Sequence, residues 1–117
     1  MSIVAENYSA IKARVSAACA RTGRDPNTVR IVGVTKTVPV ERIREGVAAG
    51  IAILGENYVQ EAEKKVDALS DLSVSWHFIG HLQSNKARSV VSWADCIHTV
   101  DRESLAVEID RQARKRG

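Results

Sequence analysis

Two hydrophobic patterns alternate along the chain, one helical and one extended. Near the N-terminus, apolar residues recur at intervals of three and four positions: Tyr8, Ile11, Val15 and Ala18. This spacing predicts an amphipathic helix over residues 3–22. Gly23 follows as the expected C-cap, and Asp25-Pro26-Asn27 has the residues of a turn.

Beyond this helix, a short apolar run and an amphipathic segment alternate four times. The runs occupy Arg30–Thr35, Ile51–Leu54, Val74–Ile79 and Cys96–Val100. After each run, apolar residues share one helical face, and the third of these helices is expected at about residues 85–92. Apolar strands that alternate with amphipathic helices indicate a parallel sheet covered by helices.

The length of the repeat narrows the kind of parallel sheet. The runs begin near residues 30, 51, 75 and 96, and such tight βα units fit a (β/α) barrel. A closed barrel needs eight units, whereas this sequence has four. The expected fold is therefore α/β: an N-terminal helix plus four βα units, half of a (β/α)8 TIM barrel, in a single domain over residues 1–117. A four-stranded flavodoxin-like sheet is the alternative, because it needs no second half.

Composition narrows the class of protein. The chain is 44% hydrophobic and 26% charged with a net charge of +3, which is typical of a globular domain and not of a disordered or collagen-like chain. No apolar run approaches the ~20 residues that span a bilayer, and the first residues do not resemble a secretory signal. We therefore expect a cytoplasmic protein with no membrane or nucleic-acid partner. Cations near the C-terminus suit the dipole of a final helix: Arg111, Arg114, Lys115 and Arg116.

The strand-to-helix turns carry the candidate chemistry, because ligands of parallel βα folds bind at the carboxyl ends of the strands. Lys36 ends the first apolar run, and strand alternation places it on the same face as Val32 and Val34, directed into the barrel mouth. A partly desolvated amine at such a place forms Schiff bases with carbonyl compounds. The alternative is a lysine that reaches from a strand end to solvent.

The other turns allow two interpretations. Glu56-Asn57 is either part of a ligand site or a cap and first-turn acid of the second helix. The main-chain N–H groups of Gly80–Ser84 are candidates for anion binding, although the segment lacks the glycines of a phosphate loop. Asp101 is most simply the N-cap of the last helix.

The histidines do not predict a metal site. His77 and His81 are four residues apart, a spacing that brings two ligands together on a helix, but Trp76–Gly80 is expected to be a strand. A site that adds Cys96 and His98 to this pair is therefore not expected.

The remaining cysteine and aromatic side chains are expected to be structural. Cys19 and Cys96 are interpreted as small, partly buried thiols, since their separation matches no metal motif. The large aromatics Trp76, Phe78 and Trp93 are expected in the core.

Four segments, taken together, resemble one protein family. They are Val-Thr-Lys-Thr-Val-Pro at 34–39, Gly-Glu-Asn-Tyr-Val-Gln-Glu at 55–61, Trp-His-Phe-Ile-Gly-His-Leu-Gln-Ser-Asn-Lys at 76–86 and Ile-His-Thr-Val-Asp at 97–101. In sequence, order and spacing they are similar to motifs of the pyridoxal phosphate homeostasis proteins, also called proline synthetase co-transcribed homologues. With the N-terminal helix, the resemblance covers essentially the whole chain.

The resemblance implies a fold-type III pyridoxal 5′-phosphate (PLP) protein, of which this chain is the N-terminal half of an alanine-racemase-like barrel. Lys36 falls on the family's Schiff-base lysine and Asn57 on a residue near the pyridine ring. Together with Val34, Gly80 and His81, these are the expected cofactor-binding residues. The implied function is PLP binding in vitamin B6 and amino-acid homeostasis, with no established catalysis.

The resemblance does not decide what completes the barrel, and it leaves two other functions open. The family is about twice this length, and its phosphate clamp comes from turns near strands seven and eight, which have no counterpart here. A homodimer, or complementation by the missing C-terminal half, is therefore expected. One alternative function is a PLP-dependent enzyme such as an amino-acid racemase, which needs an acid/base group beside the imine. The tyrosines that could supply this group are Tyr8 and Tyr58. The other is a cofactor-free interaction module that uses the basic C-terminal helix.

Overall fold

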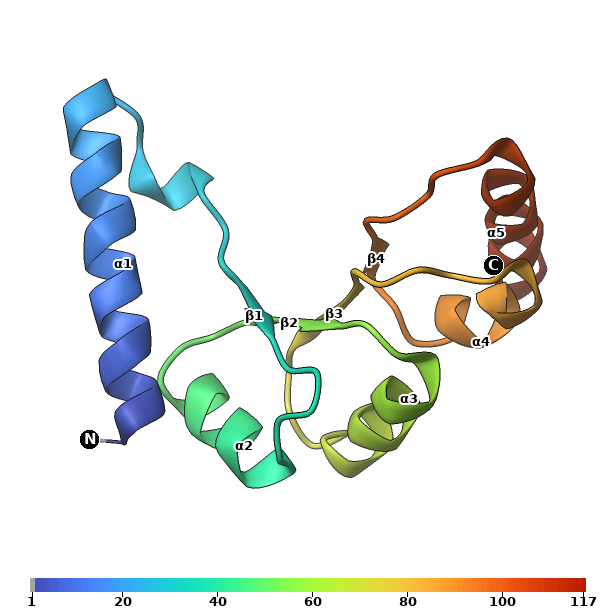
Figure 1. Ribbon diagram of the computed structural model, residues 1–117, viewed down its shortest axis with the longest axis horizontal. Coiled ribbons are helices and arrows are strands. Elements are labelled where there is room, and N and C mark those ends of the chain that lie inside the picture. The colour runs from blue at the N-terminus through green and yellow to red at the C-terminus, as the bar shows by residue number, and fades with distance from the viewer. Residues whose placement is uncertain (1) are drawn as a thin grey trace.

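The computed structural model describes residues 2–117, in which strands and helices alternate after a long first helix (Figure 1). The strands are β1 (Val32–Val34), β2 (Ile53–Glu56), β3 (Ser75–Phe78) and β4 (Cys96–Ile97). The α-helices are α1 (Ile3–Thr22), α2 (Val40–Ala48), α3 (Val59–Ala68), α4 (Ala87–Val91) and α5 (Glu103–Arg116). Two 3-10 helices are η1 (Pro26–Thr28) and η2 (Ser84–Lys86). The α/β class and the order of the elements are confirmed.

The ends of α1 follow from local chemistry. The Ser2 hydroxyl accepts a hydrogen bond from the Ala5 N–H at 3.1 Å, and Gly23 ends the helix with a φ of 72°. That left-handed conformation favours glycine, which confirms the predicted C-cap. The helix lies against the α2 unit, where the Tyr8 hydroxyl donates a hydrogen bond to the Gly50 carbonyl over 3.4 Å.

The strands form one parallel sheet in the order β1-β2-β3-β4. The register pairs Val32 with Ile53, Leu54 with Trp76 and His77 with Cys96. A flavodoxin-like sheet has the strand order 2-1-3, so that alternative is wrong. Strands that pair strictly in chain order are consistent with a partial (β/α)-barrel fold.

The hydrophobic core lies between one face of the sheet and the helices. Leu54 and Trp76 pack with Ile43 of α2, whereas Phe78 packs with Val90 of α4 and Leu105 of α5. Trp93 contacts both groups, with its ring edge-on to Trp76 at 6.5 Å and to Phe78 at 6.2 Å. The prediction that these three aromatics belong to the core is confirmed.

The opposite face of the sheet, called the open face below, bears the alternate strand residues and no helix within residues 2–117 (Figure 1). A Cβ atom on Gly55 would lie 2.9 Å from Val32 Cγ1 and 3.1 Å from Ile79 Cδ1, so the glycine lets these two side chains pack across the sheet. Val34, on the same face, is 49% exposed. Apolar side chains of the sheet therefore face solvent here.

The structure corrects two details at the last unit. The fourth strand ends at Ile97, not Val100, and Asp101 is not the N-cap of α5. Arg102 occupies the cap position, and the Asp101 carboxylate accepts a 2.8 Å hydrogen bond from the Arg102 guanidinium. A charge-assisted hydrogen bond thus replaces the expected bond to the helix N–H groups.

Burial separates the two cysteines. Cys19 is the buried residue of α1, whereas Cys96 is exposed because it lies on the open face. The prediction of a partly buried thiol is therefore wrong for Cys96. None of the helices in residues 2–117 combines the length and the apolar character needed to cross a bilayer.

Candidate functional site

Lys36 lies in a tight turn directly after β1. The Val38 N–H donates a hydrogen bond to the Thr35 carbonyl at 3.0 Å, which closes the turn, and Thr37 has a φ of 60°. Such a conformation costs a non-glycine residue about 1–3 kcal/mol, so neighbouring groups must hold it. The Lys36 side chain is exposed and not partly buried as expected, because the sheet face beside it is open.

A buried ionic cluster holds both neighbours of Lys36. Lys65 of α3, only 6% exposed, donates hydrogen bonds to Glu56 Oε2 at 2.9 Å, to Glu61 Oε2 at 2.8 Å and to the Thr35 carbonyl. Glu61 Oε2 also accepts the Thr37 N–H at 2.6 Å. The residues before and after Lys36 are thus tied to the next βα unit.

The members of this cluster hydrogen-bond to one another through Glu56 Oε2, whereas Glu56 Oε1 is buried and has no partner among residues 2–117. Lys65 uses all three of its ammonium donors, and Glu56, which is fully buried, accepts from Lys65 and from the Thr35 hydroxyl. The hydrogen bond from Lys65, together with the Thr37 N–H, lowers the pKa of Glu61 below its ordinary value, and burial opposes this shift only in part. The interpretation of Glu56 as a helix cap is wrong, since it lies in this cluster and Tyr58 occupies the cap position of α3.

The turns after β2 and β3 are in direct contact. A Cβ atom on Gly80 would lie 2.1 Å from the Asn57 carbonyl oxygen, so only glycine fits. Asn57 and His81 line one pocket of about 300 Å³ together with Lys86. Asn57 Oδ1 is buried and has no hydrogen-bond partner among residues 2–117. The structure thus brings Asn57, Gly80 and His81 together.

Val34 of β1 and Lys36 in the turn after it do not line that pocket. The parallel register pairs Val34 with Gly55, and the Thr35 N–H donates to the Gly55 carbonyl at 2.9 Å. Lys36 and Asn57 each follow this pair by two positions, just beyond the carboxyl ends of β1 and β2. All five predicted binding residues thus lie at one end of the sheet.

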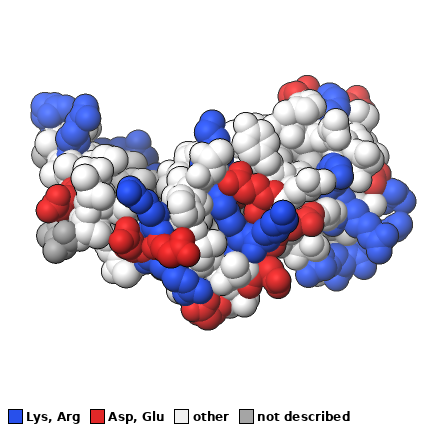
Figure 2. All heavy atoms as spheres, turned by 60° about the horizontal axis from the view of Figure 1, so that its bottom comes forward, with Lys and Arg blue, Asp and Glu red and all other residues white. Residues whose placement is uncertain are grey.

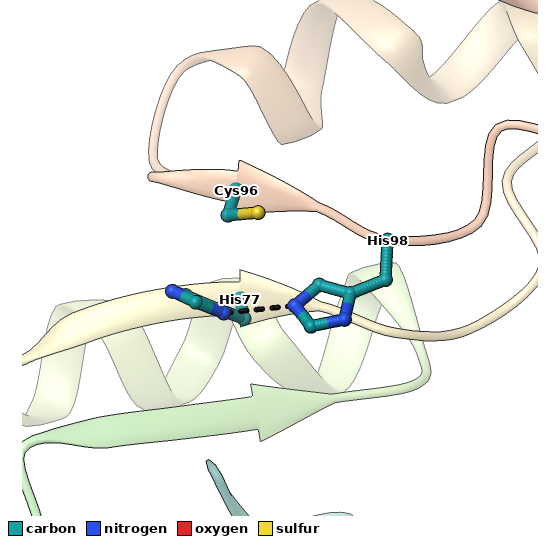
Figure 3. Close-up of side chains that lie close together, drawn as sticks. All are labelled: His77, Cys96 and His98. Atoms are coloured by element: carbon teal, nitrogen blue, oxygen red, sulfur yellow. Dashed lines mark hydrogen bonds between the residues drawn. The ribbon is translucent and has the colours of Figure 1, made fainter. Parts of the chain in front are cut away.

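Two groups of residues at this sheet escape sequence reasoning. The first group is the ionic cluster of Glu56, Glu61 and Lys65, which holds the backbone on both sides of Lys36. In the sequence, only the i,i+4 spacing of Glu61 and Lys65 indicates an interaction within this cluster. A second group, His77 and His98 with Cys96, comes together across β3 and β4 without His81 (Figure 3). These residues are brought together by the register of β3 and β4, which cannot be read from their spacing in the sequence.

Known proteins match the chain over most of its length, although no family model matches it. Curated relatives named pyridoxal phosphate homeostasis protein include those of Pseudomonas aeruginosa (45% identical over 112 residues, 96% of this chain and 49% of the relative) and Aquifex aeolicus (46% over 110 residues, 94% and 48%). The chain is homologous to the pyridoxal phosphate homeostasis family. It spans about half the length of the curated relatives it matches.

Solved structures agree with this relationship. PipY of Synechococcus elongatus PCC7942, solved with PLP bound, is 42% identical with a TM-score of 0.76, over 88% of this chain and 49% of that one. The crystal structure of an unknown protein from Bifidobacterium adolescentis is 31% identical with a TM-score of 0.85, over 97% of this chain and 51% of that one. The fold of the chain is thus shared with about half of each solved structure.

Proposed function

We propose that this chain is a single domain equivalent to the N-terminal half of a (β/α)8 PLP barrel, and that Lys36 binds pyridoxal 5′-phosphate covalently as a Schiff base. The role that follows is cofactor binding in vitamin B6 and amino-acid homeostasis, without catalysis. The observation that carries the proposal is the exposed amine of Lys36 in a turn whose two sides are fixed by Lys65 and Glu61. The PLP-bound relative PipY supports the choice of cofactor.

The residues around Lys36 suit this cofactor. Asn57 offers a buried amide oxygen that lacks a partner within the described residues, which a polar group of the pyridine ring can satisfy. Half-exposed Val34 offers an apolar surface for the ring, and Gly80 keeps the turn after β3 against the Asn57 backbone. Lys86 lines the pocket of Asn57 and His81 and supplies positive charge toward an anionic ligand.

In the proposed Schiff base, the cofactor provides one reacting group and the chain provides the other. Bound pyridoxal phosphate supplies an aldehyde, which condenses with a lysine amine to an imine and releases one water molecule. Lys36 supplies the amine, and the turn between Thr35 and Val38 fixes its backbone. Glu61 keeps Thr37 in its unusual conformation, so the lysine leaves the strand in one direction.

The test is chemical trapping. The chain is incubated with pyridoxal phosphate, reduced with borohydride, digested and mapped by mass spectrometry. We expect the label on Lys36 and its loss in Lys36→Arg. Lys12 and Lys64 are exposed controls, whereas the Lys65 amine is buried and occupied by hydrogen bonds. Equal labelling of Lys12 or Lys64 would contradict the proposal.

The same preparation tests for catalysis. Tyr8 donates its hydroxyl hydrogen bond to Gly50 on the α1 side of the molecule, whereas Tyr58 is exposed and lines the pocket of Asn57 and His81. A binding protein leaves L-alanine unchanged in the presence of pyridoxal phosphate. Racemisation that disappears in Tyr58→Phe would instead assign an acid/base role to this tyrosine and an enzymatic function to the chain.

We also infer that the open face is covered by a second copy of the chain. The strands β1 and β4 each pair on one side only, so both edges of the sheet present unpaired main-chain groups. Apolar side chains such as Val34 face solvent beside them. Two copies related by a twofold axis complete eight strands in this way, as the half-length match to the relatives suggests.

A further inference from the structure

His77, Cys96 and His98 meet on the open face of the sheet, outside the PLP site proposed above (Figure 3). His77 is paired in register with Cys96, and His98 directly follows β4. Their strand neighbours Phe78 and Ile97 point to the helices and pack in the core, so these three side chains point the other way. The parallel register therefore gathers three metal-binding side chain types on one surface.

The distances are close to those of a coordination site. His77 Nδ1 and His98 Nε2 are 2.9 Å apart, and the ligand atoms of all three residues lie within 4.8 Å of one another. Around tetrahedral zinc, bonds of about 2.0–2.1 Å to nitrogen and 2.3 Å to sulfur put ligand atoms roughly 3.3–3.6 Å apart. Cys96 and His98 are exposed, so their side chains have room for the small adjustment.

The hydrogen bond between His77 Nδ1 and His98 Nε2 is the contact that a cation would replace, since each of these nitrogens would then act as a ligand. The nearby Asp95 carboxylate already accepts the Trp76 N–H at 2.8 Å and is not part of the cluster.

We propose that His77, Cys96 and His98 form a three-ligand site for a zinc-class divalent cation, with a water as the fourth ligand. Two imidazoles and a thiolate suit Zn²⁺ and Co²⁺, whereas Mg²⁺ and Ca²⁺ prefer oxygen ligands. Binding deprotonates the Cys96 thiol and releases one proton to solvent, with no change of oxidation state.

Cobalt titration of the full 117-residue chain, without pyridoxal phosphate and under reducing conditions, tests the site directly. We expect one Co²⁺ per chain, a thiolate-to-cobalt charge-transfer band, and the loss of that band when one equivalent of Zn²⁺ is added. A chain that binds no Co²⁺, or binds it without the thiolate band, overturns the proposal.

Matched variants identify the ligands. Loss of an outer partner of a metal ligand costs 10–100-fold in affinity, so Cys96→Ser and His98→Gln should each weaken Zn²⁺ binding about a hundredfold or more. Cys19→Ser removes the other cysteine, which lies outside the cluster, and should leave the affinity unchanged. An equal loss in this control, or unchanged binding in Cys96→Ser, overturns the assignment. Lys36 labelling by pyridoxal phosphate is scored separately, so either proposal can fail alone.

Discussion

The ammonium group of Lys65 donates a hydrogen bond to the main-chain carbonyl of Thr35, the residue that precedes Lys36. Lys65 belongs to α3, whereas Thr35 ends the first strand, so the contact joins two successive βα units. The backbone of Lys36 is therefore positioned by a charge from another unit of the fold. Three predictions about stability depend on such contacts, and a fourth concerns assembly.

Replacement of Lys65 is expected to destabilise the chain strongly. Lys65→Met leaves the Glu56 carboxylate buried without its cation, and the loss of one partner of a buried ion pair costs about 3–5 kcal/mol. Urea unfolding followed by circular dichroism measures this change in the free energy of unfolding. Lys64→Met, at the exposed neighbouring position, is the control and should change it by less than about 0.5 kcal/mol. Equal effects of the two substitutions would contradict the role of the cluster.

Glu61 gives the chain a stability that disappears in acid. Its pKa in the folded protein lies below the ordinary value of 4.5, so the unfolded chain binds the proton more readily. The contribution is therefore fully present above that value and is lost as the pH falls through the lower, folded-state pKa. We expect the difference in urea midpoint between the natural chain and Glu61→Gln to shrink from about pH 7 to about pH 3. A difference that stays constant or grows in acid would show that the carboxylate is not held by Lys65 and Thr37.

The contact between Gly80 and the Asn57 backbone makes Gly80→Ala a severe substitution. A methyl group would meet the Asn57 carbonyl, and overpacking against a backbone atom should cost about 3 kcal/mol or more. Gly33→Ala is the matched control, because its Cβ would lie 3.1 Å from Ile51 Cγ2 and no nearer than 3.5 Å to a main-chain atom, the Ile53 carbonyl oxygen. Thermal and urea unfolding of the two variants compare the costs. A Gly80→Ala protein as stable as Gly33→Ala would mean that the two turns separate easily.

The open face predicts self-association of the folded chain. Light scattering on a chromatographic peak should give twice the 12.8 kDa mass of the chain. A charged side chain on that face, as in Val34→Asp, should shift the peak toward the monomer, because burying an unpaired charge is costly. The exposed Val107 of α5 lies away from the strands, so Val107→Asp is the control. A stable 12.8 kDa species for the natural chain would rule out the pairing of two copies.

Much of the fold was predictable because its signals are local. The period of the apolar residues and the glycine after Thr22 indicate α1, and the short repeat indicates parallel βα units. Boundaries were less predictable: the second strand runs to Glu56 because this side chain is neutralised inside the protein by Lys65. Glu56 and Lys65 are nine positions apart, and their ion pair depends on how β2 and α3 pack. The pattern of hydrophobic and polar residues in the sequence does not predict it.

The candidate site divides in the same way. Lys36 stands out because a cation ends an apolar strand, and Asn57 and Gly80 follow from turns at the same sheet edge. The grouping of His77 with His98 was not predictable, because it depends on which residues of β3 and β4 are paired. Register is set by three-dimensional packing, and a shift by one residue would turn either histidine to the other face.

The pairing of strands in chain order also governs how the molecule folds. Residues paired across the sheet are separated by 21 positions between Val32 and Ile53, by 22 between Ile53 and Ser75, and by 19 between His77 and Cys96. Each pairing closes a loop of similar, modest length, so the entropy to be overcome is nearly the same at every step. Each strand pairs with the one before it in the chain, so the strands can add one after another as the ribosome releases them.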